Sequence, residues 1–133
     1  MSLRISAAFL LALAGAISIS CGGIVDPSQN HVDTFSGTVP PGSGSAQHFT
    51  ASNGGEIQVK IVTLTPASVP AVLVTWLGNG DGSCNGGTFQ QGIGAAGTTA
   101  ISGQIVSGAY CVLVSDYVGQ SVTASYTITV SHP

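Results

Sequence analysis

Basic side chains are almost missing from this 133-residue sequence, in which Arg4 and Lys60 are the only lysine or arginine residues. Because a nucleic-acid partner requires a basic surface that neutralises its phosphates, the shortage excludes nucleic-acid binding. Acidic residues are also few, and the formal net charge is −3. Solubility must therefore come from Ser, Thr, Asn, Gln and Gly, a composition typical of exported bacterial β domains.

A long hydrophobic run is also missing, apart from one apolar stretch near the start, Ile5–Ile19. This stretch is shorter than the roughly 20 apolar residues that a membrane-spanning helix needs. It follows Arg4 directly, and a positive charge before a short apolar run is typical of a signal peptide. We therefore expect a signal peptide over residues 1–20.

Cys21 stands where this signal peptide ends, with Ile19 and the small Ser20 before it and Gly22–Gly23 after it. The pattern resembles the lipobox of bacterial lipoproteins, although Ser18 replaces the usual leucine. The resemblance implies that Cys21 carries a lipid that anchors the chain to a membrane, and Gly22, in place of an aspartate, implies the outer membrane. The alternative is a secretory signal cut nearby, with Cys21 left as a free thiol or as a partner for another cysteine.

Cysteines are scarce, and the chain contains three. If Cys21 carries the anchor, Cys84 and Cys111 are the remaining pair, which an oxidising envelope would allow to form a disulfide. Such a bridge would stabilise the fold by roughly 3 to 4 kcal/mol. Neither Cys-x-x-Cys nor zinc-finger spacing occurs, so we expect no structural metal and no cofactor.

Helical spacing with capping residues is also absent after residue 21. Short β-rich runs divided by turn residues take its place, and these runs cover residues 33–39, 46–52, 56–65, 71–78, 88–91, 98–106, 109–116 and 121–130. The run 71–78 is apolar on both faces. The last run places one face inward, with Val122, Ala124, Tyr126, Ile128 and Val130 on it. This pattern predicts an all-β sandwich of about seven or eight strands over residues 34–133, after a flexible tether over residues 21–33.

Two segments, "GEIQVKIVTL" and "GAYCVLVSDYVGQSVTASYTITV", resemble the bacterial pre-peptidase C-terminal domain family. The matching positions are Gly108, Tyr110, Val112, Val114, Tyr126, Ile128 and Val130. The resemblance implies a single jelly-roll-like antiparallel β-sandwich. Calcium-binding, collagen-targeting members carry an acidic cluster where this chain has "PAVLVTWLG", so the resemblance implies neither calcium nor collagen binding here.

Three glycine-rich stretches have the outline of functional motifs. "GIGAAG", residues 92–97, has dinucleotide-loop spacing, and "GSCNG", residues 82–86, has the outline of a cysteine nucleophile elbow, but each motif needs a following helix that the sequence lacks. "GNGDG" contains Asn79 and Asp81 but lacks the other ligands of a calcium loop. We interpret the first stretch as a flexible loop and the third as a hairpin loop.

Aromatic residues are few, and three of them are candidates for sugar binding: Trp76, Phe89 and Tyr117. We expect Trp76 in the core, with its indole N–H satisfied at the edge, and Tyr117 in contact with water. The sequence thus predicts a non-enzymatic, lipid-anchored cell-envelope protein that acts as a structural or interaction module. The alternative is a carbohydrate- or protein-binding module that uses Asn79, Asp81 and Tyr117. An enzyme would require a histidine close to Cys84 as a free thiol.

Overall fold

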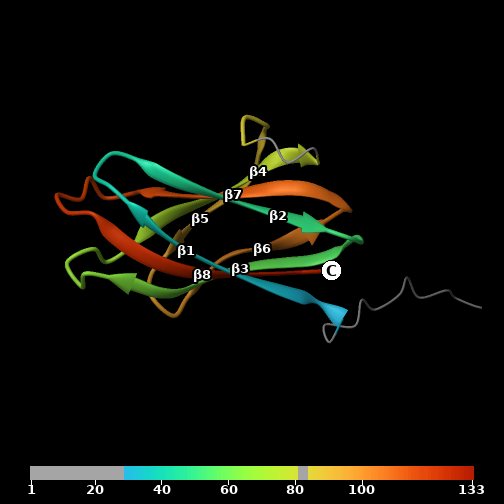
Figure 1. Cartoon of the computed structure of the whole chain (residues 1–133), viewed down its shortest axis with the longest axis horizontal. Helices are drawn as coiled ribbons and strands as arrows, with labels where there is room; N and C mark the ends of the chain where they lie inside the picture. Colours follow the sequence, from blue (N-terminus) through green and yellow to red (C-terminus); the bar gives the residue numbers. More distant parts are fainter. Residues whose placement is uncertain (1–28, 81–83) are drawn as a thin grey trace, which may run out of the picture.

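The computed structural model describes residues 29–80 and 84–133, which form eight strands in two layers and contain no α-helix (Figure 1). The described part of the chain therefore offers no helix that could span a bilayer. The strands are β1 (His31–Val39), β2 (Gly44–Ala51), β3 (Gly55–Thr65), β4 (Val72–Gly80), β5 (Thr88–Gly94), β6 (Thr99–Ile105), β7 (Gly108–Asp116) and β8 (Ala124–His132).

Each layer is a four-stranded antiparallel sheet, with strand order β1-β8-β3-β6 in one and β2-β7-β4-β5 in the other. The first strand pairs with the last, the second with the seventh, the third with the sixth and the fourth with the fifth. This is the pairing of one long hairpin wound into a jelly roll. The predicted all-β, jelly-roll-like sandwich is confirmed.

The core lies between the two sheets because apolar residues alternate along the strands. In β3, Ile57, Val59 and Ile61 are buried and the intervening side chains are exposed. In β8 the buried positions run from Ala124 to Val130 as expected, but Val122 precedes the strand and is 41% exposed. The inward-facing set therefore begins at Ala124.

Several strand boundaries differ from the sequence prediction by a few residues, and two of the differences fall in segments expected to be irregular. β1 begins at His31, inside the expected tether, because His31 and Val32 pair with the end of β8. β5 continues to Gly94, so half of "GIGAAG" is strand instead of loop. A Cβ at Gly92 would collide with the backbone carbonyl of Ala100, so glycine at this position lets β5 and β6 approach each other closely.

Asp116 closes the end of the sandwich at which β7 finishes. Its carboxylate accepts a hydrogen bond from the backbone N–H of Gly42 at 2.8 Å, in the turn between β1 and β2. It also accepts hydrogen bonds from three successive backbone N–H groups of the loop before β8, those of Val118, Gly119 and Gln120. The hydrogen bond from Gly42, then those from the loop, hold the pKa of Asp116 below its usual value. Asp116 therefore links the two loops at this end.

Candidate functional site: an aromatic pocket at one end of the sandwich

Two of the residues expected to contact a ligand, Asn79 and Tyr117, do not come together in one place. Cys21 and Asp81 lie outside the described residues. In the register of β4 and β7, Leu77 is opposite Cys111 and Val72 is opposite Asp116. Asn79 therefore lies at one end of the sandwich, whereas Tyr117, 49% exposed as expected, follows Asp116 at the other end. The backbone at Asn79 and the backbone at Tyr117 thus lie at opposite ends of the sandwich.

The predicted disulfide between Cys84 and Cys111 is confirmed and joins the segment that follows β4 to β7. Cys111 lies on the face of β7 opposite to Tyr110 and Val112, because successive strand residues point to opposite faces. The bridge therefore sits on the outer side of the sheet. It closes a segment with a sequence separation of 27 residues.

His48 lies against this disulfide, with its Nδ1 atom 3.3 Å from Sγ of Cys111 and its Nε2 atom 3.6 Å from Sγ of Cys84. The structure thus places a histidine next to Cys84, which an enzyme would require. The Sγ atom of Cys84 is bonded to Cys111, however, and a cysteine acts as a nucleophile or a metal ligand only as a thiolate. His48, Cys84 and Cys111 place their possible metal-ligating atoms within 4.8 Å of one another. In the bridged chain, however, this cluster offers the imidazole of His48 and no thiolate.

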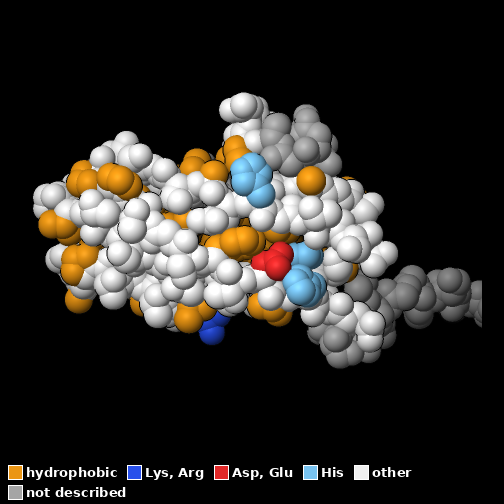
Figure 2. Space-filling view, in the orientation of Figure 1, with side chains coloured by type: hydrophobic (Ala, Val, Ile, Leu, Met, Phe, Trp, Pro, Cys, Tyr) orange, Lys and Arg blue, Asp and Glu red, His pale blue; other side chains and the backbone are white. Residues whose placement is uncertain are grey.

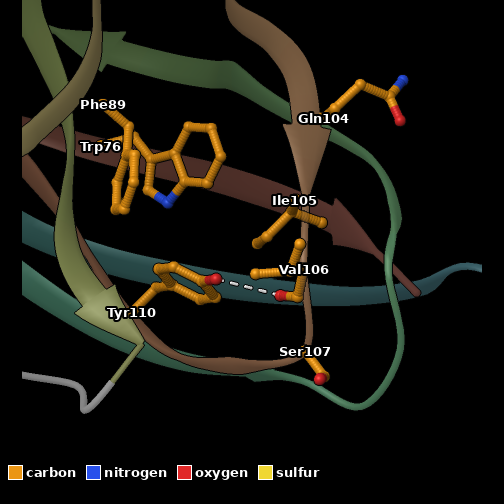
Figure 3. Close-up of a pocket in the computed structure, with 7 residues that line it drawn as sticks. All are labelled: Trp76, Phe89, Gln104, Ile105, Val106, Ser107 and Tyr110. Carbon is orange, nitrogen blue, oxygen red and sulfur yellow. Dashed lines mark hydrogen bonds between the residues drawn. The ribbon is translucent and has the colours of Figure 1, made fainter.

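A pocket of about 400 Å³ opens at the same end of the sandwich, on the inner side of the sheets (Figure 3). Its walls come from β4, β5, the end of β6, the turn after it and the start of β7. The residues that line this aromatic pocket are Trp76, Phe89, Gln104, Ile105, Val106, Ser107 and Tyr110. It therefore lies between the edge strands of the two sheets.

An irregularity in strand pairing directs Phe89 into the pocket. Trp76 is opposite Gln90, but the next residue, Leu77, is opposite Thr88, so the register shifts and Phe89 is the extra residue. Such bulges re-aim a side chain and often occur next to binding sites. The ring centroid of Phe89 lies 4.9 Å from that of Trp76.

The three aromatic rings of the pocket form one contact cluster. Trp76 and Tyr110 meet edge to face at 5.7 Å, and Phe89 lies 5.9 Å from Tyr110. Trp76 is only 5% exposed, which confirms its predicted place in the core, whereas Phe89 is 53% exposed. The cluster thus runs from the core to the half-exposed Phe89 at the surface.

The polar atoms inside the pocket are unevenly satisfied. The hydroxyl of Tyr110 donates a hydrogen bond to the backbone carbonyl of Val106 at 3.0 Å (Figure 3). The Nε1 atom of Trp76, on the side of the indole ring that faces Tyr110, is buried and has no hydrogen-bond partner among the described residues (Figure 3). The expectation that this N–H is satisfied is therefore wrong. A buried donor without a partner costs about 1–3 kcal/mol, so this N–H favours binding of a group that can accept from it.

Two other described residues have an unpartnered buried atom, Oδ1 of Asn30 and Oε1 of Gln120. Both belong to amides whose nitrogen atoms donate hydrogen bonds, Asn30 to the Ser131 hydroxyl and Gln120 to the Val39 carbonyl. The indole of Trp76 has a single polar atom, and that atom is the one without a partner. Of the three, Trp76 alone lines the aromatic pocket.

The rim of the pocket is polar but uncharged. Gln104 and Ser107 are exposed, and neither side chain makes a hydrogen bond to a residue that the structure describes. Val106 between them is 70% exposed. The lining contains no Asp, Glu, His, Lys, Arg or Cys. Its donors, acceptors and ring faces suit the binding of a neutral ligand.

Sequence reasoning singled out Trp76 and Phe89 but missed the segment Gln104–Ser107. A signal was present, because two apolar residues stand there between two polar residues just before the Gly108 that opens β7. The partnership of Trp76 with Phe89 depends on the strand register, which the sequence pattern does not fix.

A second polar cluster joins the first and last strands at the same end. Asp33 contacts Nε2 of His31 at 2.9 Å and Nε2 of His132 at 3.0 Å. The ring of His132 is buried and lies 5.1 Å from that of Phe49. Figure 2 shows an acidic side chain against histidine side chains on a face that is otherwise mostly uncharged. This cluster closes the pair of β1 and β8.

No protein-family model matches the chain, and no curated protein matches it. Two solved bacterial proteins share its fold. The mitogen derived from Yersinia pseudotuberculosis is 14% identical with a TM-score of 0.57, and the match covers 78% of this chain and 87% of the mitogen. PliG from Aeromonas hydrophila, a periplasmic inhibitor of g-type lysozyme, is 15% identical with a TM-score of 0.51, and the match covers 78% of this chain and 88% of PliG. These likenesses show the fold, and the resemblance to the pre-peptidase C-terminal family stays a prediction.

Proposed function

We propose that this chain is an exported, non-enzymatic binding module, held at the bacterial cell envelope by a lipid on Cys21, and that it binds its ligand in the aromatic pocket. The observation that carries the proposal is the buried, unpartnered Nε1 atom of Trp76 in a pocket with an exposed aromatic ring at its mouth. Pockets that combine apolar walls with a few polar groups are the usual sites of small ligands.

Export is supported by the disulfide between Cys84 and Cys111, because such bridges persist in oxidising compartments. The signal-peptide pattern before Cys21 supports it independently. PliG, which shares the fold, is periplasmic and acts as an inhibitor, so the fold is compatible with an exported binding protein. Gly22 supports the outer membrane as the final location.

A binding role is supported over an enzymatic one by the chemistry of the two candidate centres. The aromatic pocket has no histidine, carboxylate or cysteine that could act as a general base or a nucleophile. The histidine that lies near a cysteine, His48, faces sulfur atoms that are bonded to each other.

The anchor is tested by intact-mass spectrometry of the protein purified from bacterial membranes, beside a Cys21→Ala variant. We expect the mass of a lipid on a chain that begins at Cys21, and a soluble or uncleaved product for the variant. The same sample should gain the mass of two hydrogens on reduction of the disulfide. An unacylated wild-type chain in the soluble fraction would contradict the anchor and leave the pocket proposal unaffected.

The pocket is tested through Trp76, the single tryptophan of the chain, whose indole N–H gives one resolved NMR signal. A fragment library of neutral compounds that carry hydrogen-bond acceptors should contain members that shift this signal and slow its exchange with solvent. Phe89→Ala should weaken these fragments. Tyr117→Ala, which removes an exposed aromatic side chain at the opposite end, should not weaken them. If no acceptor-bearing fragment moves the indole signal, the pocket is not a binding site.

A further inference from the structure

We propose that the ligand of the aromatic pocket is a neutral pyranose ring of a glycan, an inference that rests on the proposed function. Three properties of the pocket lead to it: the absence of charge in its lining, the exposed ring of Phe89, and the set of hydrogen-bonding groups around that ring. Each property excludes a different class of small ligand.

The absence of charge argues against ionic ligands. None of the residues that line the pocket carries a charge at neutral pH, and the described part of the chain has a single lysine and no arginine. A phosphate, a carboxylate or an ammonium group would lose its hydration here without gaining a partner of opposite charge. Acidic sugars and phosphorylated ligands are therefore disfavoured relative to neutral ones.

The exposed ring of Phe89 argues for a ligand with an apolar face. Phe89 is 53% exposed, and Val106, with 70% exposure, adds a second exposed apolar side chain to the lining. Trp76 cannot serve as the stacking platform because it is only 5% exposed. A pyranose ring presents its C–H groups on a flat face, and that face can pack against the Phe89 ring.

The polar groups argue against a purely apolar ligand. A hydrocarbon would leave Nε1 of Trp76 without an acceptor, and it would form no hydrogen bond with the side chains of Gln104 and Ser107. The pocket thus offers an N–H donor, an amide with donors and an acceptor, and a hydroxyl that can do both. A ring that carries several hydroxyl groups satisfies these side chains together while its face covers Phe89.

The volume agrees with this assignment. About 400 Å³ lies in the lower part of the range of small-ligand pockets. It suits one or two sugar rings better than a long chain enclosed on all sides. We expect the pocket to hold one ring, with the remaining glycan outside.

The experiment combines a glycan array of neutral, acidic and basic sugars with NMR titration of the Trp76 indole signal, both on the disulfide-bonded chain. Blocked dipeptide amides, which also carry acceptors, form a separate arm. We expect neutral glycans to bind, to move the indole signal, and to lose about tenfold in affinity in Phe89→Ala. Trp76→Phe, measured by calorimetry, should also weaken binding because it removes the N–H. Tyr117→Ala is the matched control and should bind as the wild type does.

The possible outcomes separate the inference from the proposed function. If acidic glycans or peptide amides alone move the indole signal, the assignment to a neutral sugar ring is wrong and the pocket remains a binding site. If neutral glycans bind without moving the signal and without sensitivity to Phe89→Ala, the sugar site lies elsewhere and the inference is wrong. If neither arm moves the signal, both proposals fail.

Discussion

Replacing Cys84 and Cys111 together by alanine should lower the free energy of unfolding substantially. The bridge joins residues with a sequence separation of 27. In the chain-entropy model, a closed loop of that length restricts the unfolded chain enough to stabilise the fold by about 3.5 kcal/mol. Small domains are stable by only about 5–15 kcal/mol, so the double variant should be marginally folded. Its melting temperature should fall by about 14 °C or more.

Urea unfolding followed by circular dichroism measures this loss. Three samples separate its parts: the oxidised wild type, the double alanine variant, and the wild type held reduced. The reduced wild type keeps both sulfur atoms, so its loss reports the restriction of the unfolded chain. The alanine variant adds the packing of Cys111, whose side chain is completely buried. His48→Ala, which removes an exposed neighbour of the bridge and leaves the bridge intact, is the control and should change stability by less than about 0.5 kcal/mol.

A loss below about 1 kcal/mol in the reduced wild type would refute this reasoning. It would mean that the unfolded chain is already restricted in the segment between the two cysteines, or that the bridge forms in a small fraction of molecules. Mass spectrometry of the oxidised sample distinguishes these two cases, because a complete bridge gains the mass of two hydrogens on reduction.

Three further substitutions probe the fold around the pocket and at the opposite end. Asp116→Asn should lower the melting temperature at pH 5, and this effect should shrink as the pH falls below about 3.9. Because the folded chain lowers the pKa of Asp116, its stabilising contribution is fully present above the unfolded pKa of about 3.9 and is lost as the pH falls through the folded pKa. Gly92→Ala should cost about 1–3 kcal/mol in urea unfolding because the new methyl group meets the carbonyl of Ala100, whereas Gly87→Ala, with open space around it, should be nearly neutral. Asp33→Ala should cost about 1–3 kcal/mol in the same assay, since it leaves Nε2 of the buried His132 without its partner. His31 is exposed, so His31→Ala should cost less, and equal losses in the two variants would contradict this role of Asp33.

Strand positions could be predicted from the sequence because apolar and polar residues alternate with the period of a strand. The final strand shows this well, since Tyr126, Ile128 and Val130 were predicted to share one buried face and do so. Strand ends were less certain, because they depend on partners distant in sequence. His31 belongs to β1 only because β8 extends to His132.

The candidate site was harder to predict than the fold. The disulfide followed from counting cysteines, but the position of His48 beside it follows from the pairing of β2 with β7, in which His48 is opposite Cys111. The aromatic pocket depends on the register shift at Trp76 and Leu77, which directs Phe89 toward Trp76. A shift of one residue reverses the face on which a strand side chain lies, and no local sequence pattern sets it.

The unpartnered indole of Trp76 is better explained by ligand binding than by packing alone. A phenylalanine would fill part of the same space without burying a donor, and a buried donor without a partner opposes folding. The chain does satisfy the other buried polar side chain of the pocket lining, because the hydroxyl of Tyr110 donates to the carbonyl of Val106. The carbonyl of Val106 thus already accepts a hydrogen bond, while the nearby Nε1–H of Trp76 has no acceptor among the described residues. Exceptions to polar satisfaction tend to occur at functional sites, and this one lies beside a half-exposed aromatic ring at the open edge between two sheets. An acceptor supplied by a ligand would offset the free-energy cost of the unpartnered N–H in the unliganded fold. Replacing Trp76 by phenylalanine therefore separates folding from binding, because it removes a buried donor that opposes folding and the same donor that the ligand would use.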